Sequence, residues 1–288
     1  MAAPLGDGLR VGGALTTHSP SRLAASLARR LGWPLPIPGL GARSRDRIRA
    51  LTGASRDEWR EIAAAFPGLP RDPGPAAARA RERLARRCAR ALSTGRWRVR
   101  LDGDPPQKSP AVYVTAHIGS LQALRYVLRS RGVPAANVLG PYNLDRTRAI
   151  RDDAVFDRRH ALDFPHAFPA DKPHRLRSAL EKGSLVLAAD LPPAGSTRAF
   201  ASVLGGSVAL DARPIRLARA ARVPCRAVFL TLRRNGWTLT LSPPLEPAGA
   251  EAPALAGLAR ALERVALHAP LDLDGAVYRS LARSSGSR

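Results

Sequence analysis

The spacing of hydrophobic positions changes along the chain. It predicts helices in the first third, where residues 76–93 form a helical pattern whose polar face is rich in Arg. A second predicted helix follows the capping-box sequence at 55–58. Its hydrophobic face has helical spacing and consists of Trp59, Ile62, Ala63 and Phe66. Pro and Gly separate these patterns. We therefore expect a helical N-terminal region over residues 1–95.

From residue 96 onward, short apolar runs alternate with amphipathic helical patterns. Strands are predicted at 97–101, 111–115, 137–139, 184–189, 225–232 and 237–241. Helices are predicted at 119–131, 145–159, 173–182, 212–222 and 253–268. Strands that alternate with helices predict an α/β fold. We expect a mixed, mainly parallel central sheet flanked by helices over residues 96–288, with the helical N-terminal region appended to it.

The charge of the chain is strongly positive. Lys and Arg number 46 against 23 Asp and Glu, which gives a formal net charge of +23. This balance favours a polyanionic partner such as an anionic membrane surface, a phosphorylated substrate or nucleic acid. A coding bias towards Arg is an alternative source of part of the charge. Because aromatic residues make up only 5% and no zinc finger or helix-turn-helix signature is present, we disfavour nucleic acid.

Other features of composition exclude whole classes of protein. Two Cys cannot make a disulfide framework, which indicates a reducing compartment. No stretch approaches the roughly 20 apolar residues that span a bilayer, so we expect neither an integral membrane protein nor a secreted one. His160, His166 and His174 are too loosely spaced to predict a metal site.

The best candidate for chemistry is the segment 115–122, in which an apolar strand ends at His117 and Gly119 permits a tight turn into a helix. Sites in open α/β sheets lie beyond the carboxyl ends of the strands. A His there can act as a general base near neutral pH. Asp190 follows another buried strand and lies on the same edge if the two strands are parallel. The alternatives are a buried His117 satisfied by backbone and an Asp190 that caps a turn.

Four segments in this region resemble the late lipid A acyltransferase family, the lauroyl and myristoyl transferases within the lysophospholipid acyltransferase-like superfamily. The segments are VYVTAHIGSLQAL, LRSALEKGSLVLAADLPP, VLGGSVALDARPIRLARAARVPCRAVFLTL and GWTLTLSPPLEP, in family order over about residues 105–250. The resemblance implies that His117 is the general base on an acceptor hydroxyl, which attacks the thioester of an acyl-carrier-protein or coenzyme A donor. No other cofactor is implied.

Further residues are candidates for contacting the substrates. Backbone donors beside His117, at Gly119 and Ser120, can stabilise the oxyanion of the tetrahedral intermediate. Arg151 and Arg159 belong to an Arg-rich helix that can bind phosphate groups, or that is simply a solvated face. The pair Gly205-Gly206 replaces the family's FFG turn; it is a candidate for donor binding, and we favour a role in shaping a loop.

The sequence departs from the family pattern at its acid. Gln122 occupies the position of the carboxylate that holds the His ring, and an uncharged amide cannot stabilise an imidazolium comparably. Three interpretations stay open: the enzyme is slow, another acid such as Asp190 serves instead, or the chain binds without catalysing. The resemblance therefore implies, at most, a divergent member of the family.

Taken together, these observations predict an O-acyltransferase of lipid A biosynthesis or a related lipid pathway. Its acceptor would be a hydroxyl of a lipid or glycolipid. We expect a peripheral membrane protein on the cytoplasmic face of the inner membrane, held there by basic residues on anionic lipid. The alternatives are a catalytically weakened homologue that binds lipid or a partner and, with less support, a nucleic-acid-binding protein.

Overall fold

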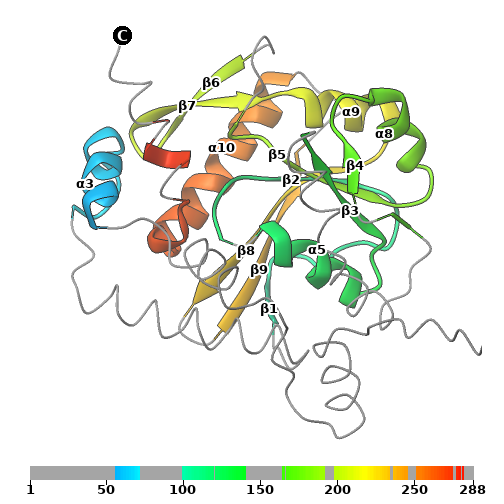
Figure 1. Cartoon of the computed structure of the whole chain (residues 1–288), viewed down its shortest axis with the longest axis horizontal. Helices are drawn as coiled ribbons and strands as arrows, with labels where there is room; N and C mark the ends of the chain where they lie inside the picture. Colours follow the sequence, from blue (N-terminus) through cyan, green and yellow to red (C-terminus); the bar gives the residue numbers. More distant parts are fainter. Residues whose placement is uncertain are drawn as a thin grey trace, which may run out of the picture.

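The computed structural model places one α/β unit together with a helix from the N-terminal region (Figure 1). It describes residues 56–71, 99–119, 121–140, 164–165, 167–191, 198–233, 236–245, 251–274, 277–279 and 281. The helices predicted over 76–93 and 145–159 lie outside the described residues.

A seven-stranded sheet forms the centre of the molecule, in the order β1-β9-β8-β2-β5-β3-β4. Its strands are β1 (Val99–Asp102), β2 (Val112–Thr115), β3 (Ala135–Leu139), β4 (Ala167–Pro169), β5 (Ser184–Ala188), β8 (Cys225–Arg233) and β9 (Gly236–Pro244). Five strands are mutually parallel, and β9 and β1 run the opposite way. The structure confirms the predicted α/β fold with a mixed, mainly parallel sheet. Strand β2 lies in the middle, with parallel neighbours on both sides.

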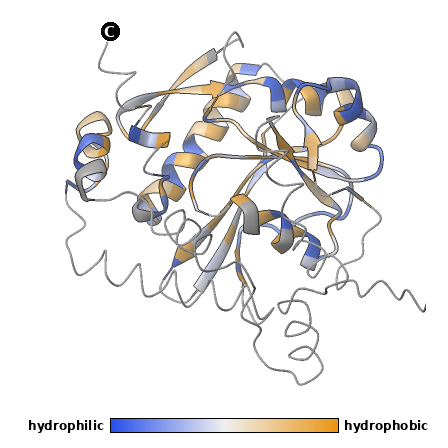
Figure 2. Ribbon diagram, in the orientation of Figure 1, coloured by the Kyte–Doolittle hydropathy of each residue, from blue (hydrophilic) through white to orange (hydrophobic). Residues whose placement is uncertain are grey.

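Helices cover both faces of the sheet (Figure 1). The described helices are α3 (Arg56–Ala65), α5 (Leu121–Ser130), α8 (Pro173–Ala179), α9 (Arg213–Ala221), α10 (Glu251–His268) and a short 3-10 helix, η1 (Pro270–Asp272). Helix α5 packs on one face, and α8, α9 and α10 pack on the other. Hydrophobic residues gather on the central strands and on the helix sides that face them (Figure 2). The core therefore has two parts, one on each side of the sheet.

A two-stranded antiparallel hairpin, β6 (Arg198–Val203) and β7 (Gly206–Asp211), was not predicted from the sequence. Its turn places Leu204 and Gly205 in the left-handed region, at φ of 55° and 75°. The hairpin packs against α10. Its last residue joins the main sheet, because the backbone N–H of Asp211 donates to the Ala189 carbonyl at 2.7 Å. The far end of the hairpin contacts α3.

Helix α3 has the hydrophobic face that the sequence predicts. Trp59, Ile62 and Phe66 are all buried, and they belong to the same core as α9 and α10. The Gly68 N–H donates to the Leu204 carbonyl at 2.9 Å, which fixes the chain after α3 against the turn of the hairpin. Residues 56–71 therefore pack on the α/β unit, although the predicted boundary at residue 95 lies outside the described residues.

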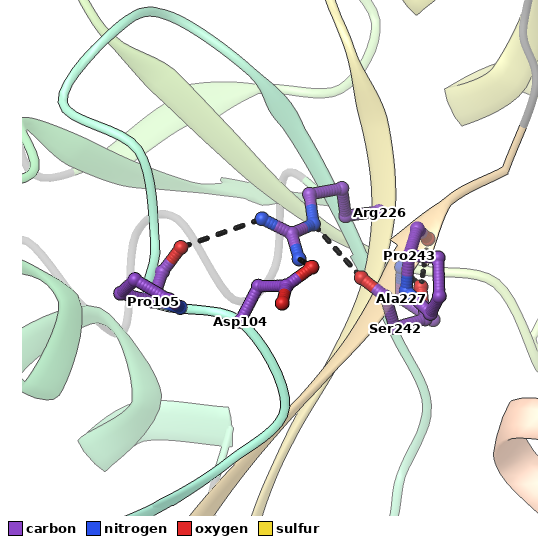
Figure 3. A network of polar contacts seen from close by, with 6 residues as sticks. All are labelled: Asp104, Pro105, Arg226, Ala227, Ser242 and Pro243. Atoms are coloured by element: carbon purple, nitrogen blue, oxygen red, sulfur yellow. Dashed lines mark hydrogen bonds and ion pairs between the residues drawn. The ribbon is translucent and has the colours of Figure 1, made fainter.

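A buried arginine connects the strands at the amino end of β2. Arg226 is 3% exposed, and its guanidinium donates to the Ser242 carbonyl at 2.8 Å and to the Pro105 carbonyl at 3.4 Å (Figure 3). It also contacts the Asp104 carboxylate at 3.3 Å. Because Arg226 pairs with Tyr113 near the start of β2, this network fixes the β1–β2 loop to the amino edge of the sheet.

Candidate active site

His117 lies just past the carboxyl end of the middle strand. Strand β2 is buried along its length and ends at Thr115, two residues before His117. The His117 side chain is 25% exposed. The prediction that a central strand delivers this His to the sheet edge is thereby confirmed. Partial exposure also separates His117 from the alternative of a fully buried structural His.

Asp190 meets His117 because the register of two neighbouring strands aligns them. In the parallel pair β2–β5, the last residues of the two strands, Thr115 and Ala188, lie opposite each other. His117 and Asp190 each follow two residues after the end of their strand. The Ala189 N–H donates to the Thr115 carbonyl at 2.9 Å, so the pairing extends past the end of β5. Two side chains that follow parallel strands at the same register position necessarily lie close together at one edge.

The Asp190 carboxylate holds His117 with both oxygens. Its Oδ1 lies 2.8 Å from the ring Nδ1, and its Oδ2 accepts the His117 backbone N–H at 2.6 Å. Asp190 is completely buried. Because a carboxylate oxygen only accepts, Nδ1 carries a proton and Nε2 has the lone pair that a general base needs. Nε2 has no hydrogen-bond partner among the residues that the structure describes.

The surroundings of His117 favour its charged form. Burial lowers the pKa of His117, but the hydrogen bond to Asp190, the charge of Asp190 and the charge of Asp274 outweigh burial and raise the pKa above its ordinary value of 6.5. An imidazole with a raised pKa is a stronger base once it is neutral. The arrangement therefore suits a group that takes a proton from a hydroxyl and returns it.

The turn after His117 depends on glycine. Gly119 has φ of 73°, and a Cβ there would lie 2.0 Å from the Leu230 carbonyl oxygen of β8. Its N–H donates to the Asp272 carbonyl at 2.8 Å. This hydrogen bond occupies the donor that the resemblance assigns to an oxyanion, so Gly119 shapes the loop and does not offer its N–H to a substrate here.

The other predicted site residues are placed as follows. Gln122 belongs to the first turn of α5, and its side chain is not described. The acceptor of the Nδ1 proton is instead Asp190, which is the second of the three interpretations left open by the sequence. Ser120, Arg151 and Arg159 lie outside the described residues.

Gly205 and Gly206 lie away from His117. They form the turn of the β6–β7 hairpin, whose other end at Asp211 adjoins Ala189. Since β7 is six residues long, Gly206 lies roughly 17 Å from Asp211 at about 3.4 Å per residue. A Cβ on Gly206 would lie 2.5 Å from the Ala65 carbonyl oxygen. The pair packs beside the end of α3, which agrees with the loop-shaping interpretation.

The described part of the chain holds neither a reactive thiol nor a metal cluster. Burial raises the pKa of Cys225 to about 12, and this residue starts β8 at the opposite edge of the sheet from His117. It is therefore not a thiolate nucleophile. No group of three or more His, Cys, Asp and Glu side chains within the described ranges could hold a metal ion.

The C-terminal segment contributes to the site, which the sequence analysis missed. The Asp274 N–H donates to the His117 carbonyl at 2.9 Å, and Ile118 pairs with Leu273 in an antiparallel bridge. The segment LDLDGAVY has two aspartates close to a tyrosine. Two aspartates near a tyrosine are a weak sequence signal for a site. Only the folded chain brings this segment to His117.

Comparison with known proteins does not assign the chain to a family. No protein-family model matches the chain, and no curated protein matches it at a significant level. The resemblance to the lipid A acyltransferases therefore rests on the four segments quoted above and stays a prediction. Among the described helices, none combines the length and the apolar character that crossing a bilayer requires.

Proposed function

We propose that the protein transfers a fatty acyl chain from a thioester to a hydroxyl of a lipid or glycolipid, with His117 as the general base. The observation that carries the proposal is the contact between the His117 ring and the buried Asp190 carboxylate at the carboxyl edge of the sheet. The substrate class comes from the motif resemblance around His117, which implies a thioester donor and a lipid acceptor.

The proposed reaction proceeds in two proton transfers. Nε2 of His117 takes the proton of the acceptor hydroxyl while the hydroxyl oxygen attacks the thioester carbonyl. Asp190 stabilises the imidazolium through Nδ1 and keeps the ring in one orientation. The tetrahedral intermediate then collapses, the carbon–sulfur bond breaks, and the imidazolium returns the proton to the leaving thiolate. The products are an ester and a free thiol.

We further propose that the acceptor is presented on an anionic membrane at the cytoplasmic face of the inner membrane. The support is the net charge of +23, since each basic residue near an anionic surface contributes about 1 kcal/mol. The donor would be coenzyme A or an acyl carrier protein in thioester form.

The second candidate function is a homologue that binds lipid or a partner without catalysing acyl transfer. The reason for it was Gln122, an uncharged amide at the position of the family's acid. The contact of Asp190 with Nδ1 of His117 weakens that reason, because a carboxylate already holds the ring, which is the task assigned to the family's acid. We therefore favour the enzyme over the binding protein.

The test is thiol release from acyl-coenzyme A and acyl-carrier-protein thioesters, with lipid acceptors in anionic or neutral vesicles at low and high salt. His117→Gln should lower release by about 10²–10⁴-fold, the contribution of general base catalysis. His174→Gln is the matched control, because His174 is exposed on α8, and it should leave the rate unchanged. Wild-type release that survives His117→Gln would overturn the mechanism. Wild-type release no higher than background with every donor would favour the binding protein.

A substitution at Gln122 separates the two possible acids. Because Asp190 already holds Nδ1, Gln122→Glu should change the rate by less than about fivefold, the effect of roughly 1 kcal/mol. A large increase in the rate would mean that Asp190 is not the acid that stabilises the imidazolium.

A further inference from the structure

The loop that carries His117 is held from two directions. From the sheet, Asp190 Oδ2 accepts the His117 N–H at 2.6 Å. From the C-terminal segment, the Asp274 N–H donates to the His117 carbonyl at 2.9 Å. Two residues further along the loop, the Gly119 N–H donates to the Asp272 carbonyl at 2.8 Å. The backbone on both sides of the His117 ring is thus fixed by residues that are distant in the sequence.

The C-terminal segment is itself anchored to β8 by a side chain. Strand β2 pairs with the first three residues of β8, Cys225–Ala227. Beyond these residues β8 meets other partners. Gly119 forms a bridge with Leu230, and Asp272 Oδ2 accepts the Leu232 N–H at 2.6 Å. The carboxylate therefore supplies an acceptor to a β8 backbone N–H at a point that β2 does not reach.

Asp272 is placed firmly for this contact. It is 2% exposed, and its own N–H donates to the Ala269 carbonyl at 2.9 Å. The next residue, Leu273, is completely buried and pairs with Ile118 in an antiparallel bridge. A buried carboxylate is costly unless its oxygens accept hydrogen bonds, so the contact with the Leu232 N–H is strongly favoured. The segment thereby has one position against both β8 and the His117 loop.

We propose that Asp272 is a positioning residue: its carboxylate fixes the C-terminal segment to β8, and the backbone of that segment then holds the His117 ring where Asp190 binds it. The proposal rests on the proposed function, since it concerns the orientation of the general base. The charged groups that raise the pKa of His117 are Asp190, from the end of β5, and Asp274. Asp272 therefore acts through the geometry of the loop and not through its charge.

The chain supplies a matched control in Glu263 on α10. Its Oε1 accepts the Leu204 N–H at 2.8 Å, so it is also a carboxylate that holds a backbone N–H. Leu204 belongs to the turn of the β6–β7 hairpin, which packs beside the end of α3 and away from His117. Glu263→Ala thus removes the same kind of hydrogen bond at a place that does not hold the His117 loop.

The first experiment is an NMR titration of the His117 imidazole, with His117→Gln used to assign the signal. Asp272→Ala should lower the pKa of His117 towards 6.5 by about 0.5 unit or more, because a looser loop weakens the contact with Asp190. Asp272→Asn should keep the wild-type titration, since the amide oxygen can accept the Leu232 N–H. Glu263→Ala should leave the titration unchanged.

A further variant separates the length of the side chain from its charge. Asp272→Glu keeps the charge but adds one methylene, so it should displace the segment and lower the pKa of His117 as Asp272→Ala does. It also provides the test if Asp272→Ala does not fold. In thiol release, both variants should lower kcat by about 10–100-fold and change the KM of the donor less than threefold, because misplacement of a catalytic group by about 1 Å has effects of this size.

The outcomes separate this inference from the proposed function. A wild-type titration in folded Asp272→Ala or Asp272→Glu overturns the positioning role. An Asp272→Asn variant that shifts as far as Asp272→Ala overturns it too, because charge would then explain the effect, and so does an equal shift in Glu263→Ala. If the titrations change as expected but no donor gives thiol release, the positioning role stands and the acyltransferase proposal fails, because the titration needs no substrate.

Discussion

The two edges of the central sheet each hold a buried charge, and they use it differently. At the carboxyl edge, Asp190 binds the ring and the backbone N–H of a single residue, His117. At the amino edge, Arg226 binds the backbone carbonyls of Ser242 and Pro105. Both charges are almost completely excluded from solvent.

The partners explain the difference between the edges. The main acceptors of the Arg226 guanidinium are backbone carbonyls, which do not titrate. Asp104, its ionic partner, is 74% exposed and adds little. His117 is a titratable group whose contacts raise its pKa, and its ring is partly exposed to solvent. A buried charge alone therefore does not mark a site; a buried charge that controls a titratable, accessible group does.

The largest expected effect is on catalysis at the carboxyl edge. Asp190→Asn should lower the rate of acyl transfer by about 10⁴-fold, as when a buried acid that orients a catalytic His is replaced by its amide. Thiol release measures this. Asp211→Asn is the control, since Asp211 is a buried aspartate at the same edge that pairs with Arg213 instead of a His. Equal losses in the two variants would mean that Asp190 acts only through stability.

An intermediate effect is expected on stability at the amino edge. Arg226→Met keeps the bulk of the side chain but leaves the Ser242 and Pro105 carbonyls without a donor. We expect a loss of about 1–3 kcal/mol in the free energy of unfolding, measured by denaturant titration, with the rate per folded molecule unchanged. Arg216→Met, at an exposed position paired with Glu251, should change stability little. A specific loss of turnover in Arg226→Met would break the contrast between the edges.

The smallest effect is the pH dependence that His117 gives to stability. Its pKa in the folded protein is raised above 6.5, so folding favours the protonated form. The resulting stabilisation is complete below about pH 6.5 and is lost as the pH rises through the folded value. The free energy of unfolding of wild type relative to His117→Gln should therefore fall as the pH rises from about 6.5 through the raised pKa of His117. A difference that grows over this range would contradict the assignment of the Asp190 contact.

Much of the fold followed from local patterns. The buried runs at 111–115 and 184–189 predicted β2 and β5, and the Trp59 face predicted α3, because each pattern reflects a side that must be covered. The β6–β7 hairpin was missed because its turn places Leu204 in the left-handed conformation. Leucine rarely adopts this conformation, so the sequence did not indicate a turn there. The three-residue strand β4 is too short to leave a pattern.

The candidate site was predictable in part. His117 was identified by its place after an apolar strand, and Asp190 by the same rule. Which acid would bind the ring was left open between Gln122 and Asp190, because sequence proximity pointed to one and strand order to the other. The contact of the C-terminal segment with the His117 loop left little signal, since Asp274 is distant from His117 in the sequence.

The sequence by itself determined most of the helices and strands, though not β4 or the β6–β7 hairpin, and it placed His117 and Asp190 after their strands. These features depend on the covering of local hydrophobic faces. Only the tertiary structure decided that β2 and β5 are neighbours in a register that aligns Thr115 with Ala188. That register brings a carboxylate to the His117 ring, and the return of the C-terminal segment brings Asp274 to the His117 loop. The strand register and the return of the C-terminal segment both depend on contacts between distant parts of the chain. These contacts stabilise the protein only once the whole core is packed.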